Sequence, residues 1–348
     1  MRVGILTGGG DCPGLNAVIR AITVQGKREG WQIIGFKNGW AGVLENRWEE
    51  LTEDKVEDIH REGGTILYTS RTNPFKEENG LQRIKDTLKE TKVDALVAIG
   101  GDDTLGVANK LYQEGIKIVG VPKTIDNDLS ATDYTFGFDS AVNVAIEAMD
   151  RLHTTAKSHN RVIVVEVMGR HAGWITLEAG IGGGAHIILI PEVPFDIEEV
   201  CQILIKRKDK GKSYSIVAVA EGAKAAKGSK FLTREVTREE KTDAFGNILL
   251  GGIAKVLEKE IAKRTGFETR SMILGHIQRG GRPSAFDRFL ATRFGLKAGE
   301  LVKEEKFGQM ASLRGTDIIS VPLKEAVGKR KEVPLKLYQE IVKPFWGR

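Results

Sequence analysis

The stretch RVGILTGGGDCPGLNAVIR, residues 2–20, decides the fold. It opens with a short apolar run, Arg2 to Thr7, which predicts a buried strand. Three glycines follow, and a helical pattern begins near Gly14. A strand that leads through such a turn into a helix is typical of α/β sheets, and the turn exposes backbone N–H groups to a phosphate. Taken alone, the turn is explained equally well as an ordinary connection. It lacks the final GK[ST] of a Walker loop, and Pro13 stands where a dinucleotide fingerprint needs its last glycine.

Similar apolar runs, bounded by glycine or proline, recur along the chain and predict buried parallel strands. They begin at Trp31, Asp94, Ile116, Arg161, His186 and Ser215. Helical patterns separate them. The clearest runs from Asp139 to His159, with one apolar face made by Val142, Ala145, Ile146, Met149, Leu152 and Ala156. Strands that alternate with helices predict an α/β fold of doubly wound, mostly parallel sheets, which we expect in two similar lobes that share a cleft.

We expect the chain to divide into four parts. These are a first lobe (1–138), a connecting helix (139–160), a second lobe (161–315) and a segment (316–348) that packs back on the first lobe. Residues 222–247 are rich in Lys, Glu, Gly and Thr, and they predict an irregular or hairpin insertion at the surface.

Composition narrows the class of function. The 52 basic and 47 acidic residues are interspersed, which argues against nucleic-acid binding, and the net charge of +5 suits small anionic substrates. Cys12 and Cys201 are the only cysteines and have no zinc-type spacing, so we expect a reducing, cytoplasmic setting. No signal-peptide pattern opens the chain and no apolar run reaches about 18 residues, which predicts no export and no membrane span.

Two more loops follow predicted strands, at the sheet edge where open α/β sheets bind ligands. The segment AIGGDDTLGVA, residues 98–108, offers Asp102 as a Mg²⁺ carboxylate and Thr104 as a cap of the next helix, although a solvated loop explains the same acids. The segment GVPKTIDNDL, residues 120–129, adds Lys123, Asp126 and Asp128. Phosphoryl transfer to an alcohol needs a carboxylate that accepts the hydroxyl proton and cations that neutralise phosphate oxygens.

Five segments now resemble, in order, the signature segments of 6-phosphofructokinases, from Arg2 to about Arg314: GGGDCPGLNAVIR, GGDDT, PKTIDND, VEVMGRHAGW and LGHIQRGG. The resemblance implies a donor lobe followed by a sugar-phosphate lobe, with the active site between them. It also implies Mg²⁺ as cofactor and transfer of a phosphoryl group to the 1-hydroxyl of fructose 6-phosphate. The insertion after Glu221 and the segments ATRFG and ASLRGTD resemble the branch that holds both pyrophosphate- and ATP-dependent members.

The resemblance also implies roles for individual residues. Asp126 matches the general base, with Thr124 and Asp128 beside it, and Asp102 matches the metal carboxylate. Donor-binding positions are Gly10, Arg71, Gly101, Asp103, Thr104 and Lys123. Sugar-phosphate positions are Thr124, Ile125, Asp126, Arg161, Met168, Gly169, Arg170, Glu221, Arg270, His276, Ile277, Gln278 and Arg279. In the family, the counterparts of Arg161 and Arg270 reach into a neighbouring subunit's site, which implies a homodimer or homotetramer.

The donor depends mainly on Asp103. The ATP-using pattern has glycine there, and commonly also where Lys123 stands. An aspartate beside the α-phosphate of a nucleotide repels it, because two like charges 4 Å apart cost about 4 kcal/mol at an effective dielectric constant near 20. We therefore predict pyrophosphate as donor, with Lys123 as a further catalytic cation, and a reversible reaction that serves glycolysis and gluconeogenesis. An ATP-dependent 6-phosphofructokinase is the alternative, because ATP-using relatives of this branch share the lysine.

Positions that resemble the effector pocket of regulated bacterial enzymes are altered. Val24 and His153 stand where arginines are expected and His186 stands where a glutamate is expected, while Arg20 and Lys212 remain. These changes agree with the lesser need for feedback control in a reversible reaction, while Arg20 and Lys212 leave a relict anion site as an alternative.

Three rival classes fit less well. A binding protein on the same scaffold would have lost Asp126, Asp102 or Arg170, and all three are present. A kinase of the broader GGD-loop kind would lack the arginines and the PKTIDND loop. A Rossmann dehydrogenase would need the glycine fingerprint that Pro13 interrupts.

Overall fold

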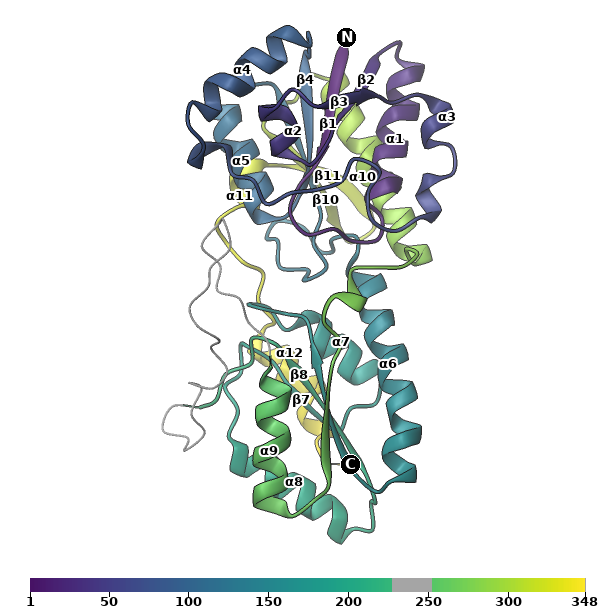
Figure 1. Ribbon diagram of the computed structural model, residues 1–348, viewed down its shortest axis with the longest axis vertical. Helices are drawn as coiled ribbons and strands as arrows, with labels where there is room; N and C mark the ends of the chain where they lie inside the picture. Colours follow the sequence, from purple (N-terminus) through teal and green to yellow (C-terminus); the bar gives the residue numbers. More distant parts are fainter. Residues whose placement is uncertain (227–251, 348) are drawn as a thin grey trace.

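The computed structural model describes residues 1–226 and 252–347. It has two lobes stacked along the long axis, and each has a sheet flanked by helices (Figure 1). The fold is mixed α/β with mostly parallel sheets, as predicted. Of the predicted insertion 222–247, residues 227–247 lie outside the described residues.

The first lobe contains a sheet of strand order β11-β10-β5-β4-β1-β2-β3. Its strands are β1 (Arg2–Thr7), β2 (Gln32–Phe36), β3 (Trp48–Glu50), β4 (Ala95–Gly100), β5 (Ile118–Pro122), β10 (Gln309–Arg314) and β11 (Asp317–Pro322). Its helices are α1 (Leu15–Arg28), α2 (Trp40–Leu44), α3 (Glu53–Val56), α4 (Gly80–Glu90), α5 (Asp102–Gln113), α10 (Ala285–Lys303) and α11 (Leu323–Ala326).

The second lobe contains a smaller parallel sheet of order β7-β8-β6-β9. Its strands are β6 (Val162–Val167), β7 (Ile187–Leu189), β8 (Ser215–Ala220) and β9 (Thr269–Ile273). Its helices are α6 (Phe138–Ser158), α7 (Trp174–Gly182), α8 (Ile197–Asp209), α9 (Ile253–Thr265) and α12 (Leu335–Ile341).

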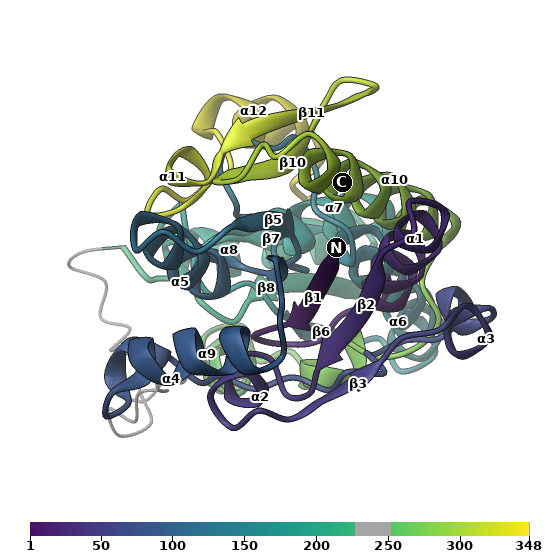
Figure 2. The ribbon, with the colours of Figure 1, turned by 90° about the horizontal axis from the view of Figure 1, so that it is seen from above.

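All seven apolar runs predicted as strands form buried parallel strands. Their residues alternate between two cores: Val3 and Ile5 pack on the side of α1 and α10, while Leu6 packs on the side of α5. Figure 2 shows α1 and α10 side by side against one face of this sheet, with α4 and α5 on the other side. Because helices cover both faces, these strands are apolar throughout instead of alternating with polar residues.

The predicted helix 139–159 is α6, one residue earlier at each end. Its predicted apolar face is buried at Val142, Ala145, Met149 and Ala156 and partly buried at Ile146 and Leu152. These side chains recur every three to four residues, so they lie on one face of the helix, and this face packs on the second sheet.

The structure differs from the expected division of the chain. Helix α10 packs along α1, and the approach is so close that a Cβ atom on Gly295 would lie 2.8 Å from the carbonyl oxygen of Val18. Met310 of β10 pairs with Gly120 of β5. Residues 285–322 are therefore part of the first lobe, and the expected boundary at residue 315 is wrong.

The expected C-terminal segment 316–348 is divided between the lobes: β11 and α11 lie in the first lobe, as expected, but the chain beyond them returns to the second lobe. Residues 327–334 cross from α11 to α12 (yellow in Figure 1). The hydroxyl of Tyr338 in α12 donates to the carbonyl oxygen of Ile188, 2.6 Å away, and the tyrosine is fully buried. None of the helices in the described part of the chain combines the length and apolarity that a membrane crossing requires.

Candidate active site

A cavity of about 320 Å³ opens where the loops after β1, β4 and β5 face the loops after β6 and β8. Carboxyl ends of parallel strands are the usual ligand-binding edge of α/β sheets. The cavity is lined by Gly9, Gly10, Arg71, Gly101, Asp102, Asp103, Thr104, Lys123, Thr124, Asp126, Asp128, Met168, Arg170, His171, Glu221, His276, Arg279 and Arg330.

The glycine-rich loop after β1 packs tightly against the loop after β4. The backbone N–H of Gly8 donates to the carbonyl oxygen of Ile99, 2.9 Å away. A Cβ atom on Gly8 would lie 2.6 Å from the hydroxyl of Thr104, and one on Gly100 would lie 2.3 Å from the Cβ of Thr104. Both positions therefore require glycine. Thr104 is not the helix cap predicted for it, because α5 begins two residues earlier and Gly101 is its N-cap.

Asp102 and Asp103 form the first turn of α5, where carboxylates are stabilised by the helix dipole. Oδ1 of Asp102 accepts a hydrogen bond from the backbone N–H of Gly328, 3.0 Å away. Asp103 is exposed and lines the cavity mouth.

Lys123 is buried between the glycine-rich loop and the acidic loop. Its ammonium group donates to the carbonyl oxygen of Gly10, and only 3% of the residue is exposed. Burial lowers the pKa of Lys123, while the nearby Cys12 and acids such as Asp126 oppose that shift. The thiol of Cys12 is itself buried, which raises its pKa to about 12.

Asp126 and Asp128 are carboxyl groups that are hard to ionise. Burial raises the pKa of Asp126, against the attraction of Arg279, Arg170 and Lys123. Its Oδ1 atom is buried and has no hydrogen-bond partner in the described part of the protein. Burial raises the pKa of Asp128 to about 6, and the negative charge of Asp126 adds to the shift.

The second lobe supplies the opposite wall. The loops that carry Arg170 and Glu221 pack so closely that a Cβ on Gly222 would lie 1.9 Å from the carbonyl oxygen of Arg170. Burial raises the pKa of Glu221 to about 7, and the charge of Asp126 contributes next, which places the two carboxyl groups across the cleft from each other.

Arg279 crosses from the second lobe to the glycine-rich loop. A guanidinium nitrogen of Arg279 donates to the carbonyl oxygen of Asp11 over 3.4 Å. A Cβ atom on Gly10 would lie 2.7 Å from the same nitrogen. Arg279 was predicted to bind the sugar phosphate, and it also contacts the loop predicted to bind the donor.

Six residues predicted to bind the sugar phosphate do not line the cavity, and four of them adjoin residues that do. Ile125 is buried in the core, and Ile277 is 66% exposed on the outside. Gln278 is buried, and its side chain accepts from the backbone N–H of Met168, 3.3 Å away. Gly169 shapes the loop, with a φ of +141° that a side chain would strain. Their positions support the site without facing it.

Arg161 and Arg270 lie at the other end of the second sheet. They stand at the amino ends of β6 and β9, whereas the cavity lies at the carboxyl ends. Both guanidinium groups pair with Glu268, at 2.8 and 2.9 Å. Neither arginine reaches the cavity of its own chain.

Three lining residues, Gly9, His171 and Arg330, were not predicted. Gly9 and His171 adjoin predicted residues in the same motifs, so the sequence could have indicated that they line the cavity. Arg330 lies in the basic run GKRKEV, and nothing local distinguishes it from a solvated surface arginine.

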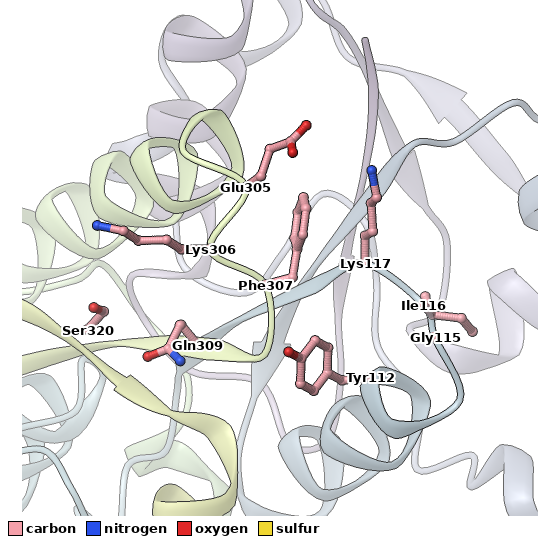
Figure 3. Close-up of a pocket in the computed structure, with 9 residues that line it drawn as sticks. All are labelled: Tyr112, Gly115, Ile116, Lys117, Glu305, Lys306, Phe307, Gln309 and Ser320. Atoms are coloured by element: carbon pink, nitrogen blue, oxygen red, sulfur yellow. The ribbon is translucent and has the colours of Figure 1, made fainter.

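A second cavity, of about 380 Å³, lies at the far ends of α5 and β5 (Figure 3). Tyr112, Phe307 and Lys117 line it, and the Lys117 ammonium group lies 5.5 Å from the centre of the Phe307 ring. Among the residues that the structure describes, the second cavity has no glycine-rich loop and no pair of carboxylates. The first cavity, which has both, is therefore the better candidate for an active site.

A glycine-rich loop, adjacent carboxylates, a buried lysine and several arginines around a cleft between two α/β lobes define a site for phosphoryl transfer. Residues 2–302 match the family described as "Phosphofructokinase". The chain belongs to the phosphofructokinase family.

Named relatives differ in the donor. The chain is 57% identical to a pyrophosphate–fructose 6-phosphate 1-phosphotransferase of Amycolatopsis methanolica, over the full length of both chains. It is 52% identical to an ATP-dependent 6-phosphofructokinase of Mycobacterium leprae, again over the full length of both. A pyrophosphate-dependent phosphofructokinase structure from Marinobacter aquaeolei shares the fold, with a TM-score of 0.83 at 22% identity, covering 99% of this chain and 91% of that one.

Proposed function

We propose that this protein transfers a phosphoryl group from pyrophosphate to the 1-hydroxyl of fructose 6-phosphate, giving fructose 1,6-bisphosphate and phosphate in a reversible reaction. The observation that carries the proposal is the Oδ1 atom of Asp126, buried, without a hydrogen-bond partner in the described part of the chain, and set among Lys123, Arg170 and Arg279. The names of the more similar relatives agree with it.

In this proposal Asp126 accepts the proton of the 1-hydroxyl. The raised pKa makes its carboxylate a stronger base than an exposed aspartate, and the three neighbouring cations favour its ionised form. The hydroxyl oxygen forms a bond to phosphorus while the bridging P–O bond of pyrophosphate breaks, and phosphate leaves. Lys123 and Arg71 are placed on the donor side, where their charges offset the charge on the phosphate oxygens.

The sugar is assigned to the second lobe. Met168, Arg170 and Glu221 line that wall of the cavity, and His276 and Arg279 lie at its edge. Guanidinium groups bind phosphate oxygens through two parallel hydrogen bonds, which favours sugar phosphates over free sugars.

Mg²⁺ is the expected cofactor. The described residues contain no group of three or more His, Cys, Asp or Glu side chains that could hold a metal. Mg²⁺ does not need one, because it commonly binds one or two carboxylates together with water and substrate phosphates. Asp102 lines the cavity, and its charge raises the pKa of Asp128, so two carboxylates lie near each other there. When bound, the ion would neutralise pyrophosphate oxygens.

Asp103 is the reason for preferring pyrophosphate. It lies at the mouth of the cavity, at the amino end of α5, where a nucleotide would have to place its additional phosphate. A negative charge there repels a longer polyphosphate and leaves the compact pyrophosphate unaffected. The ATP-dependent names among relatives at 52% identity keep ATP as the second candidate.

An oligomer is part of the proposal. Arg161 and Arg270 do not reach their own cavity, and β9 is an edge strand of its sheet. Along β9 and just beyond its end, Met272, Ile273 and Ile277 are 45%, 41% and 66% exposed. An apolar edge of this kind suits a subunit contact, through which both arginines would serve a neighbour's sugar-phosphate site.

We place the reaction in the cytoplasm, where Cys12 and Cys201 stay reduced.

The test is a steady-state assay of fructose 1,6-bisphosphate formation with Mg²⁺, comparing pyrophosphate and ATP. We expect turnover with pyrophosphate and little or none with ATP. In the Asp103→Gly variant, we expect ATP to become a measurable donor, with kcat/KM for ATP raised by about two to three decades if most of the like-charge repulsion is removed. A wild-type preference for ATP would overturn the donor, and inactivity with both would overturn the function.

A further inference from the structure

The connection between α11 and α12 passes directly over the active-site cavity. We call residues 328–333 the strap. The backbone N–H of Gly328 donates to Oδ1 of Asp102 over 3.0 Å, and the backbone N–H of Lys331 donates to the carbonyl oxygen of Asp128 over 2.8 Å. Between them, Arg330 forms an antiparallel bridge with Leu129. The strap is thus bonded to both acidic loops of the site.

The side chain of Lys331 holds the strap against the loop that follows Asp126. Its ammonium group donates to Oδ1 of Asn127 at 2.8 Å and to the carbonyl oxygens of Thr132 and Asp133 at 3.0 and 2.6 Å. The indole N–H of Trp174, in the second lobe, donates to the carbonyl oxygen of Lys331 over 2.8 Å. The backbone on either side of Arg330 is therefore held in place, so the arginine is presented at a defined point.

The side chain of Arg330 lines the cavity. Arg330 is exposed, and no salt bridge or side-chain hydrogen bond joins it to residues 1–226 or 252–347. Its charge is felt across the cavity: partial burial lowers the pKa of His171 to about 4, and Arg330 is the largest electrostatic contribution, followed by Arg170. Arg330 is a cation with access to the cavity, on the side where Asp102 and Asp103 bring negative charge.

We propose that Arg330 is a donor-binding residue whose guanidinium group binds phosphate oxygens of pyrophosphate. This inference rests on the proposed function and adds a specificity-determining residue to it. The planar guanidinium group can form two parallel hydrogen bonds with one phosphate, and the charge compensates a trianionic or tetra-anionic donor beside the aspartates. The fixed strap backbone reduces the entropy lost when the contact forms.

The test compares Arg330→Gln, Arg330→Lys and Lys329→Gln, the last a matched loss of charge on the same strap at an exposed residue outside the cavity. We expect Arg330→Gln to raise the KM for pyrophosphate about tenfold to hundredfold and to leave the KM for fructose 6-phosphate within about twofold. Arg330→Lys should recover part of the loss because the charge is retained, and Lys329→Gln should behave like wild type. Titration calorimetry with imidodiphosphate and Mg²⁺ should show the same order of affinity.

Two results would overturn the role of Arg330: an unchanged KM for pyrophosphate in Arg330→Gln, or a rise confined to fructose 6-phosphate. Either result, in an enzyme whose wild type uses pyrophosphate, leaves the proposed function standing. A wild-type enzyme inert to pyrophosphate would overturn both. Equal thermal midpoints of the three variants show that the fold is retained, as expected for exposed positions.

Discussion

Asp126 and Asp128 are separated by one residue in the same loop, and the charge of Asp126 makes Asp128 harder to ionise. Burial is the first cause of both raised pKa values, and at Asp128 the repulsion by the charge of Asp126 is added to it. Three cations limit the shift at Asp126. The loop therefore holds a carboxylate that is more basic than an exposed aspartate and that has three cations beside it favouring its charged form.

The acid limb of the pH profile tests this arrangement. A base works only when unprotonated, and burial raises the pKa of Asp126, so we expect kcat to fall, as the pH is lowered, already above the usual titration range of an aspartate. Asp128→Asn removes a like charge beside Asp126, and the limb should move to lower pH. The measurement is kcat at saturating fructose 6-phosphate between about pH 4 and 9. A limb near pH 4 in the wild type, or no movement in the variant, would contradict the coupling.

At the scale of single residues, the sequence predicted most of the motif residues that lie in the cavity, but it did not predict that Arg330 lies there. Asp102, Lys123 and Asp126 follow strands whose carboxyl ends must meet, and this was enough to predict that they lie together. Arg330 joins them only through a chain segment that begins far away in the sequence. Ile277 and Gln278 do not line the cavity, because a matching motif says nothing about which of its side chains face the cavity and which contact the loop from outside.

At the scale of elements, the amino ends of α6 and α10 are joined by a buried acid. Oδ2 of Asp287 accepts hydrogen bonds from the backbone N–H and the hydroxyl of Ser140, at 2.8 and 2.6 Å. The N–H of Ser140 belongs to the first turn of α6, where such groups lack a partner within their own helix. Asp287 thus caps a helix of the second lobe from a helix of the first, although burial raises its pKa to about 6.

Removing this carboxylate should weaken the molecule more than a surface change. We expect Asp287→Ala to lower the free energy of unfolding by about 2–3 kcal/mol because the buried N–H of Ser140 loses its acceptor. Asp287→Asn keeps an acceptor oxygen and should lose about 1 kcal/mol. Glu90→Ala, an exposed control at the end of α4, should stay within about 0.5 kcal/mol. Urea unfolding at one fixed protein concentration measures all three, and equal losses in Asp287→Ala and the control would contradict the capping role.

Seven strands were readily predicted from local pattern, since each of them is an apolar run, and α6 has a regular apolar face. The parallel strand β9, with the sequence TRSMI, was not predicted because it is an edge strand with exposed and polar residues. The assignment of the elements to lobes was less predictable. The pairing of Met310 with Gly120 joins residues far apart in the sequence, and it is decided by sheet closure and not by either local sequence. The expected boundary at residue 315 failed for this reason.

At the scale of the whole molecule, the proposed oligomer makes a prediction that a self-contained subunit does not. Asp126→Ala and Arg270→Ala should each be nearly inactive. If Arg270 serves its neighbour's site, a mixed dimer has one site with both residues intact, so mixing equal amounts after unfolding and refolding should restore about a quarter of wild-type activity. The measurement is the activity of the mixture against each variant refolded alone. No recovery would place both residues in the same subunit's site.

The first sheet also constrains how the protein is made. Strand β5 ends at Pro122, but its neighbour β10 begins only at Gln309, with the whole second sheet between them in the chain. While the ribosome is still producing that part, one edge of β5 has no partner, and unpaired strand edges of nascent chains invite aggregation. The donor side of the site, including the segment bonded to Asp102, can close only when almost the entire polypeptide has left the exit tunnel.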